Sequence, residues 1–148
     1  MKTYQHILVV SRSTRQCRRA VETGISLARL YNAQLTVLHV IHDPFSLEGW
    51  NLPVPSLEAE YRKMVEDTRK EIDKMVAKER ERGLTVYLKI REGIPQEEIL
   101  RAAEEDGADL ILISSHAQGH LEHLMFGRTN EAVIRRLPAD LLLVKEES

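Results

Sequence analysis

The chain has 148 residues, which is enough for one domain with a full hydrophobic core and too few for two ordinary domains. Its 21 lysine and arginine residues nearly balance 23 aspartate and glutamate residues, so no overall field favours nucleic acid. Cys17 is the only cysteine. A single cysteine cannot form an internal disulfide, and so low a cysteine content is typical of proteins in a reducing compartment. No apolar segment approaches the roughly 20 residues of a membrane span, so we expect a cytoplasmic protein with a single domain over residues 1–148.

Short apolar runs alternate along the chain with longer segments of helical periodicity. In chain order, the predicted strands lie at 7–10, 35–41, 84–90, 110–113 and 141–144. The predicted helices lie between them, over about 17–32, 57–83 with Pro55-Ser56 at its start, 95–107 and 129–137. Residues suited to helix ends support these bounds, with Pro95 at a first helical position and Asn32, Gly83 and Gly107 after helix ends. Residues 42–55 form the one long predicted loop.

The first, fourth and fifth predicted strands are continuously apolar rather than alternating, which indicates that both faces of these strands are covered. That pattern, together with the β-α alternation, predicts a doubly wound α/β fold with a parallel five-stranded sheet and helices on both faces. In such folds ligands bind outside the carboxyl ends of the strands, and phosphates favour helix N-termini. The loop that begins at Ser114, between the fourth strand and the last helix, is therefore the first place to expect a ligand.

Five landmarks follow one another along the chain with specific order and spacing. They are Ile7-Leu8-Val9-Val10 ahead of a helix with Arg19-Ala20, Leu38-His39-Val40, Glu92-Gly93-Ile94-Pro95-Gln96-Glu97-Glu98-Ile99-Leu100, Ala108-Asp109-Leu110-Ile111, and Pro138-Ala139-Asp140-Leu141-Leu142-Leu143-Val144. On these landmarks nearly the whole chain resembles the universal stress protein family. The resemblance implies the strand order 3-2-1-4-5 and a dimer joined through the last strand. The apolar run Leu141–Val144 favours the same homodimer, because an uncovered apolar edge strand invites pairing.

Nucleotide-binding members of that family carry a G-x2-G-x9-G-[ST] motif after the fourth strand and an aspartate at the end of the first. Laid on this chain without gaps, these five positions fall on Ser114, Ala117, Gly127, Arg128 and Arg12, and only Gly127 matches. An aspartate can accept hydrogen bonds from a ribose or water, whereas Arg12 can only donate them. The resemblance therefore implies the fold, while ATP binding does not carry over intact. No cofactor is certain, and ATP, AMP or another anion is the ligand to expect.

The implied strand order places a crevice between the first and fourth strands, and two interpretations of its arginines stay open. Arg12 and Arg128 either bind an anion there or plug the crevice by pairing with Asp43 or Glu92. The full set of candidate crevice residues is Ser11, Arg12, Ser13, Val40, Gly93, Ser114, Ser115, His116, Ala117, Gly127, Arg128 and Thr129.

No catalytic or metal-binding residues are predicted. His116, His120 and His123 have helical spacing, but Gly119 lies among them and the resemblance makes the segment a loop, so we expect no metal. The sequence has neither a phosphate-binding G-x-x-x-x-G-K-[ST] loop nor a G-x-S-x-G nucleophile motif. The resemblance therefore implies a stress-response module, which we expect to be no enzyme and to act as a dimer or by docking an unknown protein partner, with weak or lost ATP binding. The alternative is a nucleotide or anion sensor that uses the crevice. Neither nucleic acid nor a membrane is an expected partner.

Overall fold

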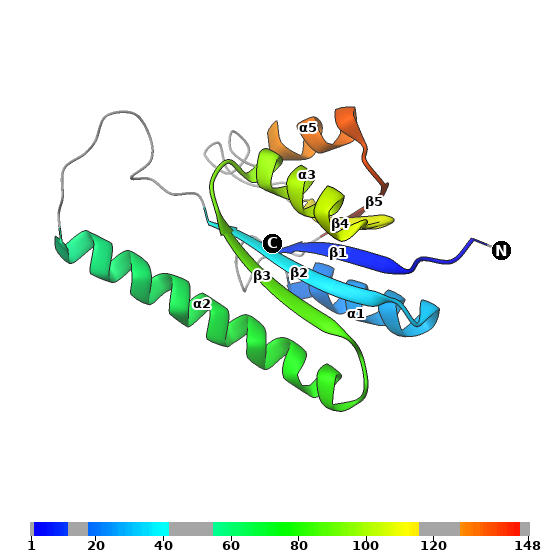
Figure 1. Cartoon of the computed structure of the whole chain (residues 1–148), viewed down its shortest axis with the longest axis horizontal. Coiled ribbons are helices and arrows are strands. Elements are labelled where there is room, and N and C mark those ends of the chain that lie inside the picture. The colour runs from blue at the N-terminus through cyan, green and yellow to red at the C-terminus, as the bar shows by residue number, and fades with distance from the viewer. Residues whose placement is uncertain (1, 12–17, 42–54, 116–127, 146–148) are drawn as a thin grey trace.

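One parallel sheet with helices on both faces organises the chain (Figure 1). The computed structural model describes residues 2–11, 18–41, 55–115 and 128–145. The strands are β1 (His6–Ser11), β2 (Gln34–Ile41), β3 (Val86–Glu92), β4 (Leu110–Ser115) and β5 (Asp140–Lys145). The helices in the described ranges are α1 (Arg18–Tyr31), α2 (Pro55–Glu81), α3 (Pro95–Asp106) and α5 (Arg128–Arg136). The sheet order β3-β2-β1-β4-β5 confirms the predicted doubly wound fold and its strand order.

Successive residues along each strand point to opposite faces of the sheet, so each inner strand contributes to two separate cores. Ile7 and Val9 of β1 pack with residues of α1 and α2 on one face, whereas Leu8 and Val10 pack with α3 and α5 on the other. The apolar side chains of β1 and β4 are buried on both faces, which explains why these strands read as continuous apolar runs.

Helix ends follow the predicted signals. Asn32, Gly83 and Gly107 all have positive φ, as expected of residues that follow a helix end. Pro95 begins α3, at a position where the backbone N–H has no partner within the helix, so the missing N–H of proline costs no hydrogen bond. Gly107 ends the same helix in the left-handed conformation. These signals fix where each helix stops and therefore where the following strand enters the sheet.

Two predictions differ from the structure. The third strand was expected at 84–90 but runs over Val86–Glu92, because the N–H of Leu84 still bonds to Glu79 O of the preceding helix at 3.0 Å. The expectation that both faces of the last strand are covered is wrong, since the side chains of Leu142 and Leu143 are 38% and 45% exposed. This strand lies at the edge of the sheet, where fewer neighbouring residues pack against it.

Some predictions concern residues outside the described ranges. They include the loop predicted at 42–55, of which only Pro55 is described and begins α2, and the three histidines at 116, 120 and 123. Within the part of the chain that the structure describes, no helix is both long and apolar enough to span a bilayer.

Candidate functional site

The strand order creates one topological switch point, between the neighbouring parallel strands β1 and β4. From β1 the chain continues to β2 on one side, and from β4 it continues to β5 on the other. The connections therefore diverge at the carboxyl ends of this pair, which is the position where ligands bind in open α/β sheets and where the sequence predicts a crevice. Ser11 ends β1, and Ser114 and Ser115 end β4, so three of the predicted crevice residues come to this edge.

A row of buried polar side chains crosses three strands at this edge. The side chains of Ser11 and Ser114 are 2% and 0% exposed, and that of His39 on β2 is 5% exposed. His39 is the register partner of Ser11, and its Nδ1 lies 3.4 Å from Ser11 Oγ. By strand alternation all three residues belong to the α1 face of the sheet, the face of Val9, Val37 and Leu112.

Burial controls the charge of His39. It lowers the pKa of the imidazole below its ordinary value, and a hydrogen bond with the backbone of Ser11 only partly offsets this effect. The imidazole therefore stays neutral at physiological pH, with one nitrogen able to donate and the other able to accept. The row offers hydrogen bonds rather than a fixed positive charge.

Helix α5 is attached to the same edge through a residue that the sequence analysis did not single out. Asn130, in the first turn of α5, donates from Nδ2 to the carbonyl oxygen of Ser114 at 3.4 Å. This contact places the first turn of α5 beside the end of β4. The signal that could have found Asn130 is its place in the turn after the predicted loop, where short polar side chains often bond to nearby backbone.

The turn between β3 and α3 lies at the same edge of the sheet, beside the carboxyl end of β2. Gly93 donates its N–H to Ile41 O at 3.1 Å, which joins this turn to the carboxyl end of β2. Its φ is +147°, and a Cβ there would lie 3.2 Å from the side chain of Glu98, so the position requires glycine. Val40, the remaining predicted residue at this end, is half-buried and packs with the α3 face.

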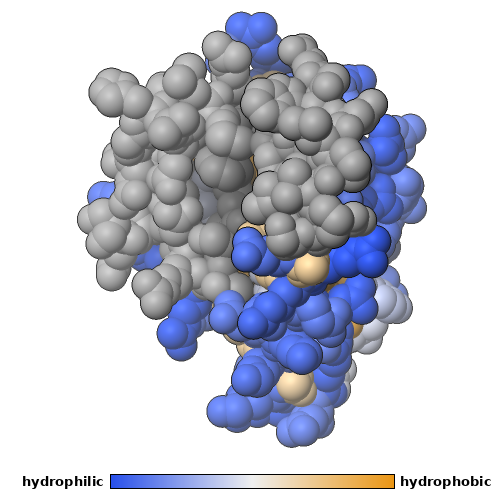
Figure 2. Space-filling model, turned by 90° about the vertical axis from the view of Figure 1, so that its left-hand side faces the viewer, coloured by the Kyte–Doolittle hydropathy of each residue, from blue (hydrophilic) through white to orange (hydrophobic). Residues whose placement is uncertain are grey.

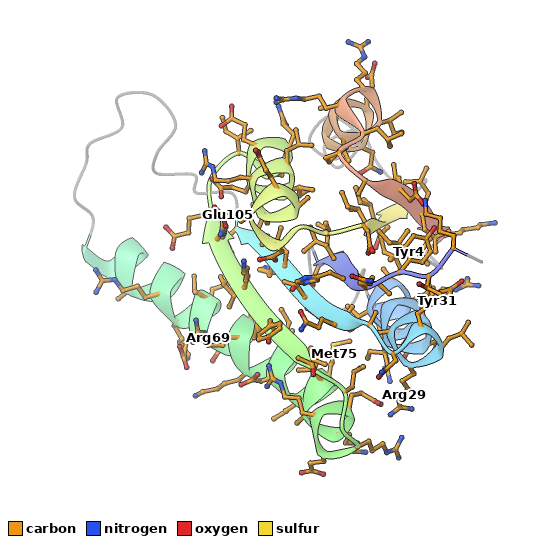
Figure 3. All side chains as sticks on the ribbon, turned by 45° about the vertical axis from the view of Figure 1, so that its right-hand side comes forward. Tyr4, Arg29, Tyr31, Arg69, Met75 and Glu105 are labelled. Carbon is orange, nitrogen blue, oxygen red and sulfur yellow. The ribbon has the colours of Figure 1, made fainter. Side chains whose placement is uncertain are left out.

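Glu98 is a buried carboxylate beneath that turn. It accepts a hydrogen bond from Arg101 Nη1 at 2.7 Å and forms an ion pair with Arg91 Nη1 at 3.6 Å. Arg91 also binds Glu105, and this hydrogen bond raises the pKa of the guanidinium and lowers the pKa of the Glu105 carboxyl. Figure 3 shows Glu105 on α3 beside the end of β3. These ion pairs hold the turn at Gly93 against α3. The charges of Glu98, Arg91 and Glu105 are all paired within the protein.

The described residues test only part of the predicted site. The structure brings Ser11, Ser114 and Ser115 to one edge and places Gly93 and Val40 at the neighbouring strand ends. Arg128 and Thr129 begin α5, but their side chains are not described. Arg12, Ser13, His116, Ala117 and Gly127 lie outside the described ranges. The roles of the two arginines therefore remain predictions.

Figure 2 views the molecule from the side where β2 and β3 end. Among the atoms coloured there, hydrophilic residues dominate and apolar ones are isolated, so this side shows no large apolar patch in the described surface. Within the same described part of the chain, no three histidine, cysteine, aspartate or glutamate residues converge as a metal site would require.

A second hollow, of about 630 Å³, lies at the opposite end of the strands beside β3. Its charged lining is largely satisfied within the protein, because Lys89 pairs with Asp106 and Arg80 Nη1 pairs with Asp73 Oδ1 at 3.0 Å. His6 Nε2 also lies 2.8 Å from Thr36 Oγ1. This hollow is therefore a weaker candidate for a ligand than the crevice at the switch point.

Comparisons with known proteins agree with this geometry. The universal stress protein family model matches residues 3–145. The chain is 28% identical to universal stress protein MJ0577 of Methanocaldococcus jannaschii, over 98% of this chain and 97% of that protein. It is 26% identical to the stress response protein NhaX of Bacillus subtilis, over 94% of this chain and 96% of that protein.

Solved structures show the same fold. A structure of MJ0577 superposes with a TM-score of 0.76 at 26% identity and covers 99% of both chains. A universal stress protein solved in complex with cAMP superposes with a TM-score of 0.62 at 18% identity, over 99% of this chain and 100% of that chain. The family model, the relatives and the topology agree, and the chain belongs to the universal stress protein family.

Proposed function

We propose that this protein is a non-catalytic stress-response module that acts as a homodimer or by docking a protein partner, with nucleotide binding weak or lost. Family membership supports the stress-response role. Weak or lost nucleotide binding is supported by the sequence at the nucleotide-binding motif. Of the five motif positions, only Gly127 has the residue found in nucleotide-binding members. The composition, with one cysteine, supports a cytoplasmic location.

Calorimetric titration with ATP tests the weakened site. Two motif glycines are replaced by Ser114 and Ala117, and the hydroxyl residue and the aspartate are replaced by Arg128 and Arg12. These changes remove several contacts of about 1 kcal/mol each, and about 1.4 kcal/mol corresponds to tenfold in affinity. We expect a dissociation constant for ATP weaker than micromolar. Submicromolar binding would contradict the proposal.

Sedimentation equilibrium tests the assembly. The side chains of Leu142 and Leu143 on the edge strand β5 are exposed, and an uncovered apolar edge of this kind favours pairing with a second chain. We expect a dimer at micromolar concentration. A monomer under those conditions would count against the assembly while leaving the nucleotide prediction untouched.

A second candidate function is a sensor of a nucleotide or another anion. The polar row of Ser11, His39 and Ser114 favours it, because these buried groups lie at the switch point where ligands bind. Under this alternative, nucleotide should remain bound through purification and be released by acid, and a panel of adenine nucleotides should identify it. Protein that carries no nucleotide and binds none of the panel would exclude the sensor.

The variant Arg128→Ser distinguishes the two interpretations of the crevice arginines. If Arg128 binds an anion, its removal takes away a charge-assisted contact of about 1.5–3 kcal/mol, and affinity for a phosphate probe should fall at least about tenfold. If Arg128 instead plugs the crevice, the smaller serine should open space and raise nucleotide affinity. The sign of the change, measured by calorimetry with phosphate and with ATP, decides between them.

A further inference from the structure

Polar side chains replace the apolar core at the amino end of the strands, on the α3 face of the sheet. His6 and Thr36 lie on the same face as Leu8, and Tyr87 is the register partner of Thr36. Thr36 is fully buried, with its hydroxyl oxygen 2.8 Å from His6 Nε2, whereas Tyr87 is 48% exposed. These polar residues line the hollow beside β3. A sheet face that served only for packing against a helix would be apolar here, so their polarity needs another explanation.

Several elements of the fold form this hollow together. Strands β1, β2 and β3 and helices α2 and α3 each contribute residues to its lining. Its volume of about 630 Å³ lies within the roughly 300–1,000 Å³ that is usual for small-molecule sites. Helix α2 is anchored by the buried residues Ile72 and Val76, and α3 is anchored by Ile99 and Ala102. The two cores therefore fix the walls of the hollow before any ligand binds.

One cation in the described lining remains without a counter-charge. Lys89 pairs with Asp106, and Arg80 pairs with Asp73. Arg69 of α2 lines the same hollow, beside β3 (Figure 3), and has no ion-pair or hydrogen-bond partner among the described residues. Both carboxylates are thus already paired, and the described lining carries one net positive charge. That charge favours a ligand with a single negative charge.

Arg80 adds a second guanidinium that the protein holds in place. Its Nε donates to Val86 O at 3.1 Å, and its Nη1 donates to Asp73 Oδ1 at 3.0 Å. These two contacts leave Nη2 without a partner among the described residues. A guanidinium fixed in this way loses little conformational entropy when it binds a carboxylate oxygen. The hollow therefore offers one mobile and one fixed donor to an anionic group.

Tyr87 supplies an apolar surface in the same hollow. Its half-exposed ring can pack against a second aromatic ring, edge to face or offset-stacked. Two polar groups of the lining keep hydrogen-bonding capacity, because His6 uses only Nε2 in its contact with Thr36 and the side-chain amide of Gln34 has no partner among the described residues. A polar substituent on the bound ring can bond to either of them.

We infer that the hollow beside β3 binds a small aromatic carboxylate, with its carboxylate at Arg69 and Arg80 and its ring against Tyr87. The single positive charge of the described lining selects a carboxylate over a phosphate monoester, which carries about 1.5 to 2 negative charges at pH 7. This site lies at the opposite end of the strands from the crevice. The inference is therefore independent of nucleotide binding and of the proposed dimer.

Titration of isotope-labelled protein with 4-hydroxybenzoate, followed by NMR, tests this site. We expect a dissociation constant of about 0.1–1 mM, as is usual for a molecule of about ten non-hydrogen atoms. Arg69→Gln should weaken binding at least about tenfold and Tyr87→Ala at least about fivefold, because they remove the counter-charge and the ring contact. Lys70→Gln is the matched control, since it removes an exposed cation of α2 that does not line the hollow, and it should bind like the wild-type protein.

The same spectra locate the probe. The backbone amide signals of Gln34 and Tyr87 should shift, whereas those of Ser11 and Ser114 at the crevice should not. The neutral analogue 4-hydroxybenzamide should bind at least about tenfold more weakly than the carboxylate.

Each contrary result overturns a stated part of the inference. No shift of Gln34 and Tyr87 at about 10 mM probe, or shifts confined to Ser11 and Ser114, would exclude the hollow as the site. Unchanged affinity in Arg69→Gln would exclude the assigned counter-charge, and tighter binding of 4-hydroxyphenyl phosphate would overturn the choice of a carboxylate. Circular dichroism of each variant checks that it remains folded.

Discussion

At the scale of single residues, the crevice combines positions that the sequence predicts with positions that only the fold reveals. Ser11 and Ser114 could be predicted, because they directly follow the apolar runs of two predicted strands, whereas His39 lies within such a run and was not singled out as a site residue. The contacts of Asn130 with Ser114 O and of Glu98 with the turn at Gly93 could not be predicted, because they depend on how α5 and α3 pack on the sheet, although the position of Asn130 in the first helical turn is itself a sequence signal. Sequence spacing indicates where a strand ends but not which helix side chain reaches that end.

The buried imidazole of His39 should make stability depend on pH. Its pKa is lowered in the folded protein by burial, so as pH falls below the ordinary value of about 6.5 the unfolded chain takes up a proton that the folded chain resists. The free energy of unfolding should therefore fall with decreasing pH in that range, by at most about 1.4 kcal/mol per pH unit for this one group.

Urea denaturation between about pH 5 and 8 checks this prediction. His39→Gln should show a shallower loss of stability on acidification than the wild-type protein. Ser11→Ala is the matched control, because it removes the hydroxyl beside His39 but keeps the imidazole, and it should retain the wild-type pH dependence. Equal slopes for His39→Gln and the wild-type protein would show that the imidazole is not the group responsible.

Gly24 of α1 allows the helix to approach β1 closely. A Cβ at this position would lie 2.3 Å from Cγ2 of Val9, a buried branched side chain that cannot move aside. Gly24→Ala should therefore destabilise the protein by about 1–3 kcal/mol through overpacking, although alanine is the better helix former. Ser26→Ala, on the exposed side of the same helix, should change stability by less than about 0.5 kcal/mol.

A double-mutant cycle identifies the cause of that loss. If the clash with Val9 is responsible, Gly24→Ala should cost less in a Val9→Ala background than in the wild-type background, with a coupling energy of at least about 0.5 kcal/mol. Additive losses in chemical denaturation would indicate that the alanine perturbs the helix in another way.

At the scale of elements, the sequence predicts helix ends better than strand ends. Helix stops depend on single residues such as Gly83 and Gly107, whose backbone conformation few other residues adopt. The start of β3 depends instead on tertiary pairing, so the apolar residue Leu84 was assigned to the strand although it still bonds to the helix. The apolarity of β5 likewise predicts burial on both faces, because a composition pattern cannot distinguish a core strand from an apolar edge strand.

The stop of α3 gives a prediction at this scale. Gly107 has φ of +61°, and the N–H of Ala108 bonds back to Ala103 O at 3.0 Å, which is the pattern of a left-handed helix cap. No atom lies within 4 Å of a Cβ built at Gly107, so only backbone strain opposes a substitution there. Gly107→Ala should cost about 1–2 kcal/mol, and Gly107→Asn should cost less, since asparagine tolerates this conformation. Equal losses for the two variants in thermal unfolding would argue against strain as the cause.

At the scale of the whole molecule, the strand order determines where the candidate ligand site lies and which strands form the edges of the sheet. It places β1 beside β4, which brings Ser11 and Ser114 together, and it leaves β3 and β5 as the two edges. The alternating β-α pattern predicts the fold class, whereas the order of the strands came from the resemblance to a family, because periodicity does not state which strands are neighbours. The T-shaped contact of Tyr4 with Tyr31, seen in Figure 3, shows the same dependence on topology, since it joins the segment before β1 to the end of α1.

If the protein dimerises through β5, its thermal stability should depend on its concentration. Association stabilises only the folded state, so each tenfold rise in concentration should raise the melting temperature by about 2–5 °C. Leu143→Lys places a charge on the exposed edge and should abolish this dependence, whereas Leu30→Lys, at a position on α1 that is 74% exposed, should retain it. Scanning calorimetry of all three proteins over a hundredfold range of concentration provides the measurement. A wild-type melting temperature that stays constant over that range would argue against a dimer in which folding and association are coupled.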